Sequence, residues 1–241
     1  MKTLTLATVL SLMLIASCIS SSAQTTGKTF AHIQNMAAWS SCDVCSGSGG
    51  QGSTAVHWQA QFQRTPSLSG SSSQFYFGGT SSYSSALWWE QLGANPQFRH
   101  FKYDLRFYLT DINAPQALEF DVNQSLNGKK YIFGTECDLR GTYKGYWRVW
   151  DASLHWQNTG VPCAGITANA WHRLTWEFER TTEGHTHFVA VTVDGVRRVV
   201  NRYYNPTNSS AKELNVAFQT DGNKYPNTYS VWLDNVTLSA W

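Results

Sequence analysis

The feature that most constrains this chain is a two-residue alternation of apolar and polar side chains in nearly every segment after residue 52. In FRHFKYDLRFYL, residues 98–109, the apolar side chains from Phe101 to Leu109 fall on one side and the polar ones on the other. Successive side chains of a β-strand point to opposite faces, so this period is typical of half-buried strands. No window of ten or more residues indicates an amphipathic helix. The chain is therefore predicted to be all-β.

Short strands separated by glycine, asparagine and aspartate turns favour a two-sheet antiparallel sandwich, and a jelly roll in particular. Asn127-Gly128 and Asp194-Gly195 are turn pairs that tolerate positive φ and close hairpins. No linker or repeat divides the later part of the chain. We expect one jelly-roll domain over 52–241, preceded by a flexible N-terminal segment and cysteine loop over 24–51.

The first 23 residues are predicted to be a secretory signal peptide. A basic residue, Lys2, precedes an apolar run that ends at Ala16, and small residues follow up to Ala23. The alternative is a bacterial lipoprotein, because residues 15–18, Ile-Ala-Ser-Cys, resemble a lipobox that would acylate Cys18. The protein is thus expected to be secreted or periplasmic in a bacterium, or anchored to a membrane by lipid. No later stretch is long and apolar enough to be a transmembrane segment.

Charge argues against nucleic acid as a partner. The chain has 18 Lys and Arg against 16 Asp and Glu, a formal net charge of +2, and no basic block or stripe. Nucleic-acid binding depends on concentrated positive charge. A composition rich in aromatic, Ser, Thr, Asn and Gly residues instead suits a surface that meets a neutral, hydroxyl-rich polysaccharide or cell-surface glycan.

Four cysteines remain after Cys18, and in an oxidising compartment they predict two disulfides. We favour Cys42 with Cys45 and Cys137 with Cys163. A four-cysteine zinc site is the alternative, since Cys42 and Cys45 have ligand spacing. The 26 residues between Cys137 and Cys163 do not have that spacing.

The hairpin over residues 116–139 brings acidic residues together. If Asn127-Gly128 forms the turn, paired residue numbers sum to 255, and Glu119 lies opposite Glu136 on the polar face. Asp121 and Asn123 lie on that same face. Like charges directly opposed across strands are destabilising, so a cation, an arginine, a shared proton or a ligand must offset them. Arg148, on the next predicted strand, is the candidate positive partner.

Aromatic side chains near these acids are candidates for stacking on sugar rings. Tyr146 and Trp150 alternate with Arg148 on one face of a predicted strand, and Trp89 follows Trp88 on another. Adjacent residues of a strand point to opposite sides, so about half of these rings belong to the core. Trp176 and Trp232 are predicted to be core residues, because their neighbours are apolar.

The motifs VTVDGV and VWLDNVTL, with the single-chain strand pattern, resemble the concanavalin A-like lectin/glucanase superfamily, including laminin-G-like jelly rolls. The chain is also similar to exported bacterial proteins that carry QALEFDVNQ and FGTEC. The resemblance to the superfamily implies a curved sheet whose concave face binds glycans and, in some members, hydrolyses or lyses polysaccharides. We therefore expect a lectin-like protein that needs no cofactor.

The resemblance also implies an enzymatic alternative. Laminarinase-type glycosidases carry E-x-D-x-x-E or E-x-D-x-E on one strand, and Glu119-Phe120-Asp121 matches the first half. Asn123 and Gln124 replace the second glutamate, so the motif is broken, and Glu136 would have to supply the missing acid. The enzyme would then be a retaining glycosidase or a lyase with Glu119 and Glu136 as catalytic residues.

Two further expectations remain open. Similar closing strands in sugar-binding sandwiches contribute an acid to a structural calcium site, which makes Asp234 a candidate metal ligand. A purely structural envelope protein is the third functional alternative.

Overall fold

A computed structural model describes residues 26–43 and 55–241. The predicted signal peptide, the alternative lipid anchor at Cys18, and Cys45 with its pairing to Cys42 lie outside the described residues. Within the described ranges, no helix has the length and apolar character that crossing a membrane requires.

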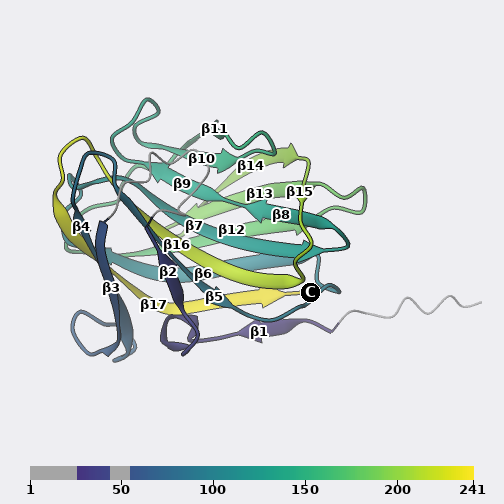
Figure 1. The fold of residues 1–241 in the computed structure, drawn as a ribbon, viewed down its shortest axis with the longest axis horizontal. Coiled ribbons are helices and arrows are strands. Elements are labelled where there is room, and N and C mark those ends of the chain that lie inside the picture. The colour runs from purple at the N-terminus through teal and green to yellow at the C-terminus, as the bar shows by residue number, and fades with distance from the viewer. Residues whose placement is uncertain (1–25, 44–54) are drawn as a thin grey trace, which may run out of the picture.

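Two antiparallel sheets pack face to face as a jelly-roll sandwich, which confirms the predicted fold class (Figure 1). Sheet A has the strand order β14 (Val196–Tyr204), β13 (Thr186–Val193), β12 (Trp171–Arg180), β6 (His100–Leu109), β17 (Thr228–Ala240), β4 (Ser72–Gly79) and β3 (Ala55–Gln63), with β1 (Lys28–Phe30) beside β17. Sheet B has the order β11 (Trp156–Pro162), β10 (Tyr146–Trp150), β9 (Thr135–Asp138), β7 (Pro115–Leu126), β16 (Glu213–Gly222), β5 (Ser85–Gln91) and β2 (Ser40–Cys42). β8 (Lys129–Phe133) pairs with β7 and with β15 (Thr207–Asn208). Among the described residues the only helix is the 3-10 turn Ile33–Asn35.

The two-residue period sets which side chains form the core between the sheets. In β6 the alternate residues from Phe101 to Leu109 are buried, as the alternation predicts. Phe107 of sheet A packs on Phe120 of sheet B with ring centroids 5.4 Å apart, and Phe120 packs in turn on Phe218. β7 is buried on both faces for most of its length. The outer face of β7, which points away from the core between the sheets, is therefore also shielded from solvent. That outer face forms the candidate site.

Both predicted hairpins form. Asn127 and Gly128 have φ of 51° and 79°, and Asp194 and Gly195 have φ of 47° and 85°. Two consecutive positive φ values match the twist of a tight β-hairpin, and these residue types adopt them at low cost.

The first hairpin has the predicted register. Leu126 pairs with Lys129 at the turn, and the sum of 255 persists to Glu119 and Glu136 at its far end. A slip of one residue would reverse the two faces, so this register decides that the acids lie away from the core.

Cys137 and Cys163 form the predicted disulfide, with Cα atoms 5.9 Å apart. The bond ties β9 to the segment that follows β11 and uses two of the four thiols that a zinc site would need.

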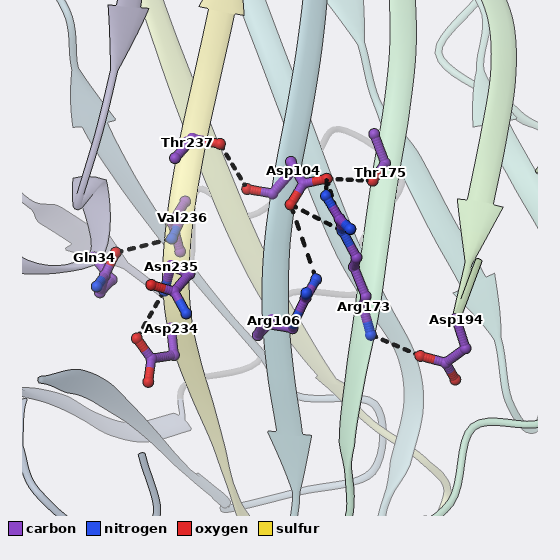
Figure 2. A network of polar contacts seen from close by, with 10 residues as sticks. All are labelled: Gln34, Asp104, Arg106, Arg173, Thr175, Asp194, Asp234, Asn235, Val236 and Thr237. Atoms are coloured by element: carbon purple, nitrogen blue, oxygen red, sulfur yellow. Dashed lines mark hydrogen bonds and ion pairs between the residues drawn. The ribbon is translucent and has the colours of Figure 1, made fainter. Parts of the chain in front are cut away.

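The outer face of sheet A carries a polar network away from its edge (Figure 2). Asp104 accepts hydrogen bonds from Arg173 and Thr175 and lies 3.9 Å from Arg106. The side chains of Asp104, Arg106 and Arg173 are 17%, 29% and 49% exposed, so the network belongs to a solvated face, where charged pairs contribute little to stability.

The prediction that Trp176 and Trp232 are both core residues is half right. Trp176 is fully buried. Trp232 lies on the outer face of sheet A, because it alternates with the buried Val231 and Leu233 and pairs with Tyr108 of β6. The strand period therefore predicts the position of Trp232 correctly, whereas the apolar character of its neighbours does not.

Candidate functional site

A groove with a volume of about 530 Å³ lies over the outer face of sheet B. Its lining comes from strands β5, β16, β7, β8, β9, β10 and β11. Figure 1 shows β7, β16 and β9 running side by side, and the strand order places them between β5 and β10. The groove thus runs across the strands, and residues paired between neighbouring strands form rows along it.

One row has tryptophans at both ends, with Ala217, Asp121 and Gly134 between them. Trp89 of β5 pairs with Ala217 of β16, and Trp150 of β10 pairs with Trp156 of β11. The two indoles of β10 and β11 contact edge to face, with centroids 4.8 Å apart. Beside them, a Cβ at Gly134 would lie 2.9 Å from the Cβ of Trp150, so glycine is required for this close approach. The result is a hollow between aromatic walls.

The neighbouring row consists of hydrogen-bonding side chains. Gln219 of β16, Glu119 of β7, Glu136 of β9 and Arg148 of β10 are paired in sequence across the four strands. The Gln219 amide donates to Glu119 over 2.5 Å. Arg148 forms an ion pair with Glu136 and lies 3.7 Å from Asp138. Each of the two opposed glutamates therefore has a hydrogen-bond donor on the side that faces away from the other glutamate. These donors offset the repulsion between the two acids.

Two aspartates flank this row. Asp121 lines the groove beside Glu119 and accepts a hydrogen bond of 2.8 Å from the backbone N–H of Thr135. Asp221 of β16 accepts one of 3.0 Å from the Gln219 amide. One oxygen from each of Glu119, Glu136 and Asp221 lies within 4.8 Å of the others. Such a set can share a proton or surround a cation, and it can accept hydrogen bonds from several hydroxyl groups.

Burial dominates the electrostatics of these acids. It raises the pKa of Asp121 to about 7, against the opposing hydrogen bond from Thr135, and the pKa of Asp221 to about 6. Burial, with repulsion from Asp221 and Asp121, raises the pKa of Glu119 well above its usual range. Burial also raises the pKa of Glu136, although Arg148 lowers it in part. Burial therefore favours the protonated form of these carboxyl groups.

Most of the residues proposed from the sequence come together here. Glu119, Asp121, Asn123, Glu136, Arg148, Trp89 and Trp150 all line the groove. Asn123 donates a hydrogen bond to Asn215 of the adjacent strand β16. Tyr146 is 41% exposed and is not part of the groove lining, although it lies on the same strand as Arg148.

Sequence reasoning missed the contribution of β16. Gln219, Asp221 and Ala217 alternate on one face of ELNVAFQTDG, and that alternation was a usable signal for a shared face. It did not show which strand lies beside β16, because Gln219 and Glu119 are 100 residues apart in the chain. Strands so far apart in the sequence are not joined by a tight turn, so their register cannot be counted from one.

The broken laminarinase-type motif can now be placed in space. Gln124 points away from the groove and donates to the backbone carbonyls of Asn95 and Phe98. Asn123 faces the groove but carries an amide. Within the described residues, the acid nearest in role to the missing glutamate is Glu136, directly opposite Glu119 on the neighbouring strand.

Asp234 lies outside the groove, next to the loop between β3 and β4. Its carboxylate accepts hydrogen bonds from the hydroxyls of Ser67 and Ser69 and from the backbone N–H groups of Leu68 and Ser69, at 2.6–3.0 Å. Burial alone would raise the pKa of Asp234, but these donors outweigh it and lower the pKa. N–H and O–H donors satisfy a carboxylate without a cation, so Asp234 holds this loop in place. Calcium at Asp234 stays a prediction.

No known family model and no curated protein sequence matches the chain. Among solved structures, it is similar to the cellulose induced protein Cip1, with 10% identity over 83% of this chain and 90% of that one, at a TM-score of 0.50. It is also similar to the alginate lyase Aly36B (9% identity, 83% and 97% covered, TM-score 0.49) and to the carbohydrate recognition domain of Emp47p (9%, 88% and 94%, 0.47). At 10% identity the likeness to Cip1 speaks for the sandwich fold alone, because one fold hosts many functions.

Proposed function

We propose that the protein is a lectin-like, carbohydrate-binding sandwich whose groove on sheet B holds a glycan chain laid across the strands. The observation that carries this is the pair of adjacent rows, one ending in tryptophans and one made of hydrogen-bonding side chains. Sugar rings offer apolar faces that stack on indoles and hydroxyl groups that bind polar side chains, so they need both kinds of surface side by side.

The dimensions of the groove agree with an oligosaccharide. Trp89 on β5 and Trp150 on β10 are four strand spacings apart in the order β5-β16-β7-β9-β10. At about 4.8 Å per spacing, the two walls are about 19 Å apart, a length that several linked sugars can span. The small side chain of Ala217 and the bare backbone of Gly134 leave room for a glycan above them, with Asp121 between the two positions.

Export is part of the same proposal. The disulfide between Cys137 and Cys163 suits an oxidising compartment, as the predicted leader does. A protein outside the cytoplasm meets polysaccharides and cell-surface glycans, and the proposed ligand belongs to that setting.

A second candidate function is glycoside hydrolysis or polysaccharide lysis by Glu119 and Glu136. The observation that favours it is that these residues, with Asp221, bring carboxylate oxygens within 4.8 Å of one another, close to the separation of about 5 Å in retaining glycosidases. Their raised pKa values also suit a site where one acid donates a proton. Against it, Glu119 and Glu136 are only 7% and 2% exposed, and Arg148 already engages Glu136.

The test is a pull-down with insoluble polysaccharides and a glycan array, followed by chromatography of any released products. Wild type and the variants Trp89→Ala, Glu119→Gln and Glu136→Gln are compared. We expect wild type to bind without added metal and to release no product, and Trp89→Ala to lose most of the binding. Products from wild type that disappear in both glutamate variants would establish the enzyme instead. The absence of binding across broad panels would favour the structural envelope role.

A further inference from the structure

We propose, on the basis of the glycan-binding function above, that the groove accepts uncharged glycans and excludes those that carry carboxylate or sulfate groups. This selectivity for uncharged glycans follows from the charged residues of the groove and from their partners. It does not rest on the similar sandwich proteins.

The cations of the groove are already engaged by its own acids. Among the described lining residues only Lys130 and Arg148 carry a positive charge. Arg148 is paired with Glu136, and its guanidinium also lies over the Trp156 ring at 6.0 Å. Lys130 lies 4.0 Å from Glu213. An incoming sugar carboxylate would therefore meet an acid of the protein beside either cation.

The remaining charges of the lining are acidic. They are Glu119, Asp121, Glu136, Glu213 and Asp221. When these groups are ionised, a carboxylate or sulfate on the ligand meets like charge, which is strongly unfavourable across an interface. When burial keeps some of them protonated, the ligand anion still loses its water without gaining a counter-charge. Both protonation states therefore disfavour an acidic sugar.

Uncharged sugars face no such barrier. A hydroxyl group donates to a carboxylate and also accepts from an amide or a carboxylic acid, so it can bind the acids in either state. Gln219 and Asn215 add amide groups to the same lining. The groove lining is thus rich in partners for hydroxyl groups, and within the described residues each of its cations has an acid of the protein beside it.

The experiment measures binding to matched pairs of oligosaccharides that share a backbone and differ only in charge. Suitable pairs are β-1,4-mannan with β-1,4-mannuronan, methyl-esterified with de-esterified homogalacturonan, and cellulose oligosaccharides with their C6-oxidised forms. We expect binding to the neutral member of at least one pair and at least about tenfold weaker binding to its acidic partner. Equal or tighter binding to the acidic member would overturn the inference while leaving glycan binding intact. Binding to no member of any pair, together with no binding on the glycan array, would overturn the glycan-binding function itself and the inference with it.

A pair of variants links the selectivity to the named charges. Glu213→Gln removes the acid that engages Lys130, and we expect it to narrow the ratio of neutral to acidic affinity severalfold. Glu177→Gln breaks an ion pair with Arg197 on sheet A, away from the groove, and serves as the control. An unchanged ratio in Glu213→Gln, or an equal change in Glu177→Gln, would contradict the role of the groove charges. Thermal melting of each variant shows whether it is folded.

Discussion

At the scale of single residues, the molecule places Glu119 directly opposite Glu136 and offsets the repulsion from both sides. Gln219 donates to the first acid and Arg148 pairs with the second. The sequence was sufficient to predict the opposed acids and Arg148, because a tight turn fixes the count along one hairpin. It was not sufficient for Gln219, whose strand joins the row from a distant part of the chain.

The buried acids predict a pH dependence of stability. Asp121 has a usual pKa of 3.8 and a folded-state pKa of about 7, so the folded protein holds this proton more tightly than the unfolded chain. Its contribution to the free energy of unfolding is therefore complete below about pH 4 and declines as the pH rises toward 7. We expect the protein to be less stable at pH 8 than at pH 5 by about 1–3 kcal/mol.

Thermal melting at both pH values measures this, and a fall of several degrees in Tm from pH 5 to pH 8 is expected. Asp121→Asn keeps an oxygen that can accept from Thr135 and removes the titrating proton. This variant should show a smaller fall than wild type. A Tm that rises from pH 5 to pH 8 would show that the acids of the groove are not held in their neutral form.

At the scale of elements, the hairpin of β7 and β8 controls the site. Its turn residues fix the register, and the register places the acids on the groove side and Phe120 and Val122 in the core. This part of the fold was predictable, because Asn-Gly turns and strand alternation are local properties. The order of strands in the sheet was not, since β16 lies between β5 and β7 through contacts that no short sequence pattern specifies.

The turn itself can be tested. Gly128 has φ of 79°, a value that β-branched residues rarely adopt. We expect Gly128→Val to lower the free energy of unfolding by about 1–3 kcal/mol, measured by urea denaturation. Gly128→Asn should cost less, because asparagine tolerates this region of φ better. If valine and asparagine proved equally harmless, the tight turn would not be what sets the register of the hairpin.

At the scale of the whole molecule, the two sheets have different outer faces. Sheet B carries the groove with its tryptophan walls, whereas sheet A carries the network around Asp104 (Figure 2) and, at its edge, Trp58 stacked on Tyr76. The sandwich class followed from the strand period alone. Which sheet bears the site followed only from the pairing of β7 with its neighbours, because both outer faces contain exposed aromatic and charged residues.

The measurement that tests the central claim most directly is a calorimetric titration of one neutral glycan, selected from the matched pairs, into wild type, Trp89→Ala and Trp58→Ala. Trp89 walls the groove on sheet B, and Trp58, 42% exposed on sheet A, is the matched control. Loss of a stacking indole in a binding site commonly costs 2 kcal/mol or more, so we expect Trp89→Ala to weaken binding at least about tenfold. Trp58→Ala should leave the affinity within about twofold of wild type, an effect below 0.5 kcal/mol. Full affinity in Trp89→Ala together with a loss in Trp58→Ala would contradict the account and move the binding site to sheet A.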